Sequence, residues 1–195
     1  MQEDEDMDAL SDTDLAAAMI ARREGAFESF ARRNHDSLLG FARYVCGEHA
    51  EEVLQETLLK AYQSIQDLRD PAALRSWIYR IAVNECRRIR QREWRGRTIE
   101  LPLEDVGEVI SLSSQSELPL DALLKGELRE KLEDAILSLP DDFQIVLVLR
   151  DLEGFSTQEA ASILEIGEPL VRVRLHRARS AVRRSLLPYV HGQSA

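Results

Sequence analysis

Apolar side chains recur every three or four positions along most of this chain, a spacing typical of amphipathic α-helices. Residues 51–68 contain the first clear example, with apolar positions at Val53, Leu54, Leu58, Ala61, Tyr62, Ile65 and Leu68. Residues 74–89 contain the second, with apolar positions at Leu74, Trp77, Ile78, Ile81, Ala82, Cys86 and Ile89. Each predicted helix therefore has one side for a core and one side for solvent or a partner.

The same spacing fills the segment before residue 50, with Gly25, Asn34 and Gly47 as possible breaks between helices. Together these segments predict one helical domain over residues 13–97. Residues 1–12 are rich in Asp and Glu and contain no Lys or Arg. They predict an acidic, disordered tail.

A change of composition separates this domain from the rest of the chain. Residues 98–126 combine proline, glycine, serine and many acids with little sustained period, which predicts an acidic, flexible linker. Periodicity returns over residues 127–187, which predict a second helical domain, and residues 188–195 predict a tail. Residues 143–149 are apolar nearly all round, as in a helix at the centre of its domain.

The end of the second domain has the pattern of a helix-turn-helix. Ser156 and Glu159 predict a capping box, in which each side chain satisfies the other's backbone N–H at the start of a helix. A short helix and a turn at Gly167 then lead to a longer helix, whose first turn suits Pro169. The inner stripe of the longer helix is Val171, Leu175, Ala178 and Val182, and its outer stripe is Arg172, His176, Arg179 and Arg183.

In such a motif the second helix lies in the major groove of DNA, where guanidinium groups meet phosphates or guanine edges. The predicted fold class is therefore all-α, with two small helical domains joined by a flexible linker and a helix-turn-helix in the second domain.

Charge is distributed unevenly along the chain. The net charge of −10 alone argues against a nucleic-acid-binding protein, but residues 87–97 and 172–184 are strongly basic. In the first domain Arg80, Asn84 and Arg87 fall on one polar stripe of their predicted helix. These local concentrations of arginine favour contact with a polyanion.

Other chemistry finds little support in the sequence. Cys46 and Cys86 lie in apolar helical patterns, which predicts two reduced, buried thiols in a cytoplasmic protein. Cys46, His49 and Glu52 recur at steps of three, but no further Cys or His lies near them in sequence, so no metal or other cofactor is predicted. No nucleophile–base motif or phosphate loop stands out, so the chain is predicted not to be an enzyme.

Membrane insertion is also excluded by the sequence pattern. The amino terminus lacks a basic segment followed by an apolar one, so no secretory signal is predicted. The longest strictly aliphatic run, at residues 145–149, is far shorter than the roughly 20 residues that cross a bilayer.

Three segments of the chain resemble a known family. They read HAEEVLQETLLKAYQSI, LRSWIYRIAVNECRR and LPDDFQIVLVLRDLEGFSTQEAASILEIGEPLVRVRLHRARSAVRR. These segments are similar to bacterial RNA polymerase sigma factors of the extracytoplasmic-function (ECF) type. The resemblance covers most of residues 24–97 and 127–187, in the order in which the family places its regions two and four.

The resemblance implies a function and its partners. In the family, region two docks on the clamp helices of the polymerase β′ subunit and melts the minus-ten promoter element, while region four reads the minus-thirty-five element and sits on the β flap. It therefore implies core RNA polymerase, promoter DNA and an anti-sigma factor as partners, and a role in transcription initiation under stress.

The resemblance also implies site residues. The polymerase-binding residues would be Glu51, Glu52, Gln55 and Glu56. The DNA-binding residues would be Trp77, Arg80, Asn84, Arg87 and Arg88 in region two, and Leu170, Arg172, Arg174, His176, Arg179 and Arg183 in region four. Residues 68–75 match the loop that receives a flipped base, which agrees with the need of DNA melting for a pocket that holds an unstacked base.

Two departures from the family pattern bear on specificity. Pro169 and Leu170 stand where the family usually has Gly-Thr at the start of the recognition helix. Leu170 cannot donate a hydrogen bond to a phosphate, although it can touch a thymine methyl group. His49 replaces the usual Asp at the start of the docking motif, which affects clamp contacts or the choice of partner.

Alternative functions stay open at the level of sequence. A stand-alone helix-turn-helix regulator would use its first domain to dimerise on palindromic sites. A sigma mimic would bind a regulatory protein and never touch DNA, and a metal-dependent helical hydrolase is the least favoured reading. For single features the alternatives are a solvated face for the acids of residues 51–56, a core position for Trp77 and a solvated helix end for the arginine run.

Overall fold

A computed structural model describes residues 7–93 and 127–190 of the chain. Every regular element within these two ranges is helical, which confirms the predicted all-α fold class. The predicted linker and the arginines beyond Glu93 lie outside the described residues.

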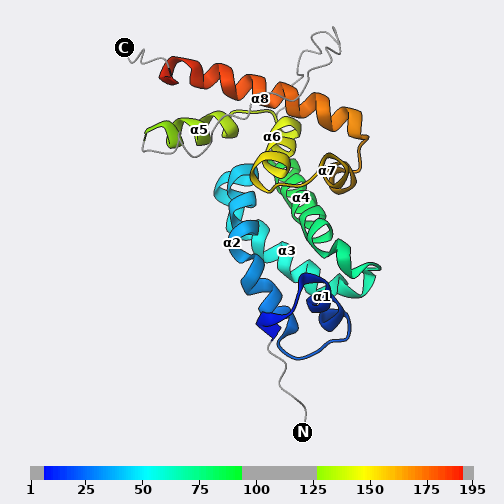
Figure 1. Cartoon of the computed structure of the whole chain (residues 1–195). Coiled ribbons are helices and arrows are strands. Elements are labelled where there is room, and N and C mark those ends of the chain that lie inside the picture. The colour runs from blue at the N-terminus through cyan, green and yellow to red at the C-terminus, as the bar shows by residue number, and fades with distance from the viewer. Residues whose placement is uncertain (1–6, 94–126, 191–195) are drawn as a thin grey trace.

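The first range forms one helical region, drawn from blue to green in Figure 1. Its α-helices are α1 (Asp12–Ile20), α2 (Ala26–Cys46), α3 (Ala50–Ser64) and α4 (Leu74–Glu93). Short 3₁₀ turns are η1 (Met7–Ala9), η2 (Gly47–His49), η3 (Ile65–Asp67) and η4 (Pro71–Ala73). Helices α2, α3 and α4 contact one another pairwise, and α1 packs on α2, α4 and η4.

Two of the three predicted helix breaks in this region are confirmed. Gly25 and Gly47 have positive φ angles of 77° and 57°, which glycine adopts at little cost. Asn34 is not a break, because it lies inside α2 and its side chain donates to the carbonyl of Phe30 one turn earlier (2.9 Å). That local bond satisfies the polar side chain without interrupting the helix.

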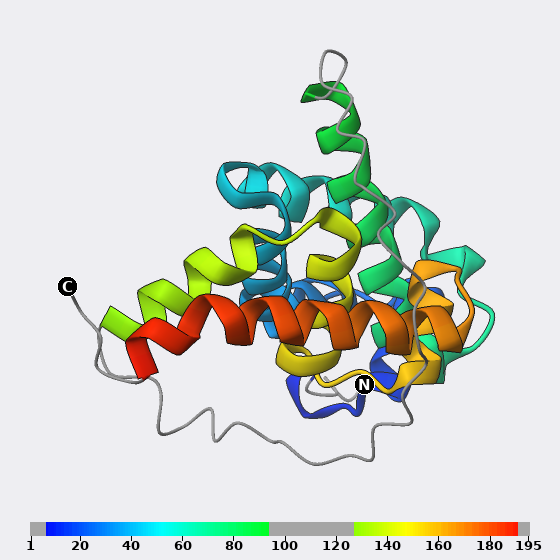
Figure 2. The ribbon, with the colours of Figure 1, turned by 90° about the horizontal axis from the view of Figure 1, so that it is seen from above.

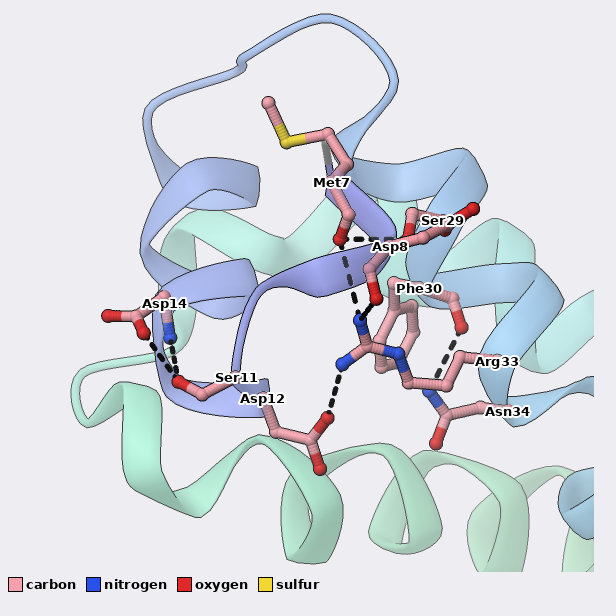
Figure 3. Close-up of polar contacts among 9 residues, drawn as sticks. All are labelled: Met7, Asp8, Ser11, Asp12, Asp14, Ser29, Phe30, Arg33 and Asn34. Atoms are coloured by element: carbon pink, nitrogen blue, oxygen red, sulfur yellow. Dashed lines mark hydrogen bonds and ion pairs between the residues drawn. The ribbon is translucent and has the colours of Figure 1, made fainter. Parts of the chain in front are cut away.

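Part of the segment predicted to be a disordered tail forms regular structure. Residues 7–9 form the turn η1, and Ser11 caps α1 by accepting from the backbone N–H of Asp14. Asp8 accepts hydrogen bonds from Arg32 and Ser29 of α2, which hold the pKa of its carboxyl below the usual value. Figure 3 shows the neighbouring contact of Asp12 with Arg33. Acidic composition predicted disorder here because it could not reveal these cationic partners on α2.

The second range forms the other helical region. It contains α5 (Glu127–Leu137), α6 (Asp141–Leu147), a π-helical turn η6 (Val148–Leu152), α7 (Thr157–Leu164) and α8 (Glu168–Val190). Helix α8 packs across α5, α6 and α7, and Figure 2 shows it crossing in front of them. Residues 145–149 are all buried, which confirms the central apolar helix predicted there.

Helix α8 extends three residues beyond the predicted domain end at residue 187 and includes Pro188. A proline deprives the carbonyl one turn earlier of its helical partner. That carbonyl belongs to Arg184, which is exposed, so water can replace the lost bond.

The two regions pack against each other. Helix α4 contacts α7, and α2 contacts α5, α6 and η6. Figure 1 shows α4 running up to the junction between α6 and α7. None of the helices that the structure describes is long and apolar enough to cross a membrane.

The expectation of two reduced thiols is wrong. Cys46, the last residue of α2, forms a disulfide with Cys86 in α4, and their Cα atoms lie 5.8 Å apart. This separation falls in the range that a disulfide spans. The two residues are 40 positions apart in sequence, so local pattern could not reveal their contact. Among the described residues no group of three or more potential metal ligands is present.

We expect this disulfide to stabilise the first region against unfolding. A cross-link over 40 residues restricts the unfolded chain and contributes about 3–4 kcal/mol by loop-closure entropy. Urea unfolding of the oxidised chain should therefore show a higher midpoint than unfolding in a thiol reductant. Cys46→Ser should match the reduced chain under both conditions, and equal midpoints for the oxidised and reduced wild type would contradict the prediction.

Candidate nucleic-acid interface

The acidic residues predicted to bind polymerase share one side of α3. Glu51, Glu52 and Gln55 are exposed and Glu56 is half-buried, whereas Val53, Leu54, Thr57 and Ala61 on the other side are buried. The exposed side continues into two large apolar side chains, Leu59 (50% exposed) and Tyr62 (65% exposed). Sequence reasoning assigned Tyr62 to the buried stripe, but the neighbouring Ala61 fills that position. Acidic and apolar side chains together form a surface suited to a protein partner.

The residues predicted to face DNA on α4 are not equally accessible. Asn84 is exposed, and Arg80, Arg87 and Arg88 are half-buried. Trp77 is only 9% exposed and belongs to the core, because it lies on the side of α4 that packs inward with Ile78.

Ion pairs join the acidic side of α3 to the basic side of α4. Glu85 is nearly buried and accepts from both Lys60 and Arg88, the latter at 2.7 Å. Burial alone would raise the pKa of Glu85, but these hydrogen bonds outweigh it and hold the pKa below its usual value. Arg88 also lies 3.8 Å from Glu56. The predicted docking and DNA-binding residues are therefore electrostatically coupled.

The helix-turn-helix forms as the sequence predicted. Ser156 and Glu159 make both hydrogen bonds of the capping box. The turn between α7 and α8 contains Glu165 in the left-handed conformation, with φ of 58°. The inner stripe of α8 is buried throughout, at Val171, Leu175, Ala178 and Val182. This stripe fixes α8 against α6 and α7 and so sets which side chains face outward.

Three arginines predicted to contact DNA are bound to acids of their own region. Arg172 lies 2.6 Å from Glu168, and Arg179 donates two hydrogen bonds, of 2.8 and 2.6 Å, to Asp151. Arg174 lies 2.5 Å from Asp142, and its side chain is only 18% exposed. His176 and Arg183 are exposed. The exposed large apolar residues of the first turns are Leu170 and Val173. Sequence reasoning missed Val173, although its position opposite the inner stripe was a usable signal.

The contact between the two regions centres on Tyr79 of α4. Its hydroxyl donates to the Glu153 carboxylate (2.5 Å), and its ring lies edge-on to Phe155, with centroids 4.8 Å apart. Arg75 donates to the Glu153 carbonyl and places its guanidinium 4.1 Å from the centre of the Phe155 ring. Tyr79 and Phe155 are fully buried. The segment predicted to receive a flipped base therefore ends against the other region.

A second contact between the regions lies further along α4. Arg90 donates to the Val45 carbonyl and to the Gln144 side chain (2.7 Å), and it forms an ion pair with Asp141 of α6. These contacts tie the end of α2 and the last turn of α4 to the start of α6. The two regions are thus held at both ends of α4.

Burial at the Tyr79 contact shifts the pKa values of its two titratable groups. Burial, reinforced by the hydrogen bond to Glu153, raises the pKa of Tyr79 far above its usual value. Burial also raises the pKa of Glu153, and the opposing effects of Tyr79 and Arg75 reduce this shift without cancelling it. Tyr79 therefore remains a neutral hydrogen-bond donor at physiological pH.

Comparison with known proteins identifies both regions. The family model for Sigma-70 region 2 matches residues 30–96, and the model for Sigma-70 region 4 matches residues 129–182. The chain is 30% identical over 183 residues to the ECF RNA polymerase sigma-E factor of Haemophilus influenzae, covering 92% of this chain and 97% of that protein. It is 31% identical over 156 residues to the protein of the same name from Escherichia coli (strain K12), covering 76% and 80%.

Solved structures show the same arrangement of helices. CnrH, in complex with the cytosolic domain of CnrY, matches with a TM-score of 0.64 and 25% identity over 90% of this chain and 96% of that one. The sigma factor RpoE from Bartonella quintana, in complex with the anti-sigma factor NepR, shares the fold with a TM-score of 0.63 and 22% identity, covering 83% and 97%.

The raised pKa of Glu153 predicts how stability depends on pH. Because the folded chain holds this proton more tightly than the unfolded chain, the Glu153 contribution to the free energy of unfolding is greatest below the usual pKa of 4.5 and is lost as pH rises through the folded value. Glu153→Gln should therefore gain stability relative to wild type as pH rises from 4 to 8, as measured by urea unfolding. Glu165→Gln, at an exposed acid, serves as the control, and a constant difference between Glu153→Gln and wild type would contradict the assignment.

Proposed function

This chain belongs to the extracytoplasmic-function family of RNA polymerase sigma factors, which direct the polymerase to promoters, and we propose that its two regions divide this work through separate surfaces. Helix α3 docks on the clamp helices of the β′ subunit, α4 faces the minus-ten element, and α8 reads the minus-thirty-five element while its region sits on the β flap. The chain acts as a non-catalytic subunit in the cytoplasm, where its polymerase is found.

The exposed side of α3 is the observation that carries the docking assignment. Its three exposed polar residues, Glu51, Glu52 and Gln55, border two apolar side chains that remain open to solvent. Charged residues at a rim around apolar contacts are the usual composition of a protein–protein interface. Leu59 and Tyr62 therefore extend the docking surface that the acidic residues begin.

Promoter recognition requires the two regions to separate. The two promoter elements lie about 25 base pairs apart, roughly 85 Å along B-form DNA. In the structure α4 and α7 are in direct contact through Tyr79 and Phe155. We infer that this closed form is the conformation of the free chain. Binding to polymerase and promoter breaks the contact between the regions and holds each region at its own docking site.

An anti-sigma factor is the natural candidate for a further partner. The solved relatives CnrH and RpoE were each determined with a bound protein, the cytosolic domain of CnrY and the anti-sigma factor NepR. Such a partner would regulate this chain by competing with polymerase for its surfaces.

In-vitro transcription tests the proposed function. Core polymerase from the source organism should initiate at defined sites on genomic promoter fragments when this chain is added, and these transcripts should be missing without it. Failure to produce any chain-dependent transcript, together with failure to bind core polymerase, would contradict the proposal.

Positive charge introduced on α3 should weaken the docking step selectively. The double substitution Glu51→Lys and Gln55→Lys places two cations on the exposed side of α3 without removing a described ion pair, and it should lower the affinity for core polymerase at least tenfold. Glu24→Lys and Glu28→Gln, at exposed positions before and within α2, change the net charge by the same amount and provide the matched control. Affinity for core polymerase is measured by fluorescence anisotropy. Equal affinities for the two double variants would contradict the assignment of α3 as the docking helix.

A further inference from the structure

Two large apolar side chains are exposed at the start of the recognition helix α8. Leu170 is 42% exposed and Val173 is 40% exposed. They are three positions apart, so they lie side by side on one face of the helix. Solvent exposure of two adjacent apolar side chains is unfavourable unless they have a partner.

The geometry of α8 places Val173 opposite the buried stripe of the helix, with Leu170 beside it. Each residue of an α-helix is rotated by about 100° from the previous one, given 3.6 residues per turn. Val173 therefore points almost directly away from the buried stripe of Val171, Leu175 and Ala178. Leu170 lies next to it on the same face, and Arg177 follows one turn later.

The arginines of these turns lie on the flanks of this face. Arg172 is paired with Glu168 on one side, and Arg174 is paired with Asp142 of α6 on the other. Arg179 is held by two hydrogen bonds to Asp151. These ion pairs hold the guanidinium groups on the flanks, so the centre of this face is apolar at Val173 and Leu170.

The surroundings of the two apolar residues favour DNA as that partner. Exposed basic residues continue along the same side of α8, at His176, Arg177, Arg183 and Arg184. This arrangement fits a helix in the major groove. The row of cations would meet phosphates, while Leu170 and Val173 at the start of the helix would reach base edges. In helix-turn-helix proteins the first residues of the second helix contact base edges.

We propose that Leu170 and Val173 determine promoter specificity by contacting the 5-methyl groups of thymines in the minus-thirty-five element. This inference rests on the proposed function, which places α8 in the major groove. The thymine methyl is the apolar group that base pairs present there, and a leucine or valine side chain cannot hydrogen-bond the polar edges of the other bases. The minus-thirty-five element should therefore contain A·T pairs at the positions that the start of α8 contacts.

Deoxyuridine substitution tests this contact directly, because deoxyuridine differs from thymidine only by the missing 5-methyl group. Holoenzyme at limiting concentration is assayed by transcription from a mapped promoter in which each thymine of the upstream element is replaced in turn. Loss of one buried methyl-sized group should lower initiation about fourfold at one or two thymines. Leu170→Ala and Val173→Ala should each abolish the sensitivity at one of these thymines.

Leu187→Ala provides the matched control. Leu187 is similarly exposed, at 45%, but lies near the far end of α8. This variant should retain the full response to deoxyuridine, so a general effect of removing an exposed leucine is distinguished from loss of a base contact.

Four outcomes would overturn the inference. In the first, transcription depends on the chain but is unchanged by every deoxyuridine substitution. In the second, the minus-thirty-five element contains no A·T pairs. Either result would contradict the thymine contact and leave the proposed function intact. Equal losses for Leu170→Ala and Val173→Ala on thymine and deoxyuridine templates would show that the two side chains bind a protein instead. No chain-dependent transcription at all would reject the proposed function together with the inference.

Discussion

Edge-to-face packing of three buried aromatic rings is the interaction that holds this structure in its closed form. Tyr79 of α4 lies edge-on to Phe41 of α2 on one side and to Phe155 of the second region on the other, with ring centroids 5.3 and 4.8 Å apart. A buried tyrosine also needs a partner for its hydroxyl, and Glu153 supplies it. One side chain therefore belongs to the core of the first region and to its contact with the second.

This arrangement gives α4 two roles that conflict. Its outward side carries Arg80 and Asn84, which we assign to promoter DNA, while its two ends hold the second region through Tyr79 and Arg90. On the proposed function, reading two distant promoter elements breaks those contacts and exposes Tyr79 and Phe155 to water. Binding to polymerase and DNA must offset this cost, so the free chain is expected to be a poor DNA-binding protein.

Local structure was predictable because its causes are local. Periodicity located the helices, the capping box located the start of α7, and the inner stripe of α8 followed from residues three and four apart. Contacts between distant residues were not predictable in this way. The Cys46–Cys86 disulfide and the pairing of Arg174 with Asp142 join residues on different helices. The outward position of Val173, by contrast, followed from the inner stripe that periodicity had already located.

The most direct test of the closed form is energy transfer between fluorophores on the two regions. Labels at Arg43→Cys, near the end of α2 that Arg90 ties to α6, and at Ser185→Cys use exposed positions, and the native cysteines are paired in the disulfide. The account predicts high, uniform transfer in the free chain and a clear decrease when the chain binds core polymerase and promoter DNA. Transfer that is low in the free chain, or unchanged in the promoter complex, would contradict it.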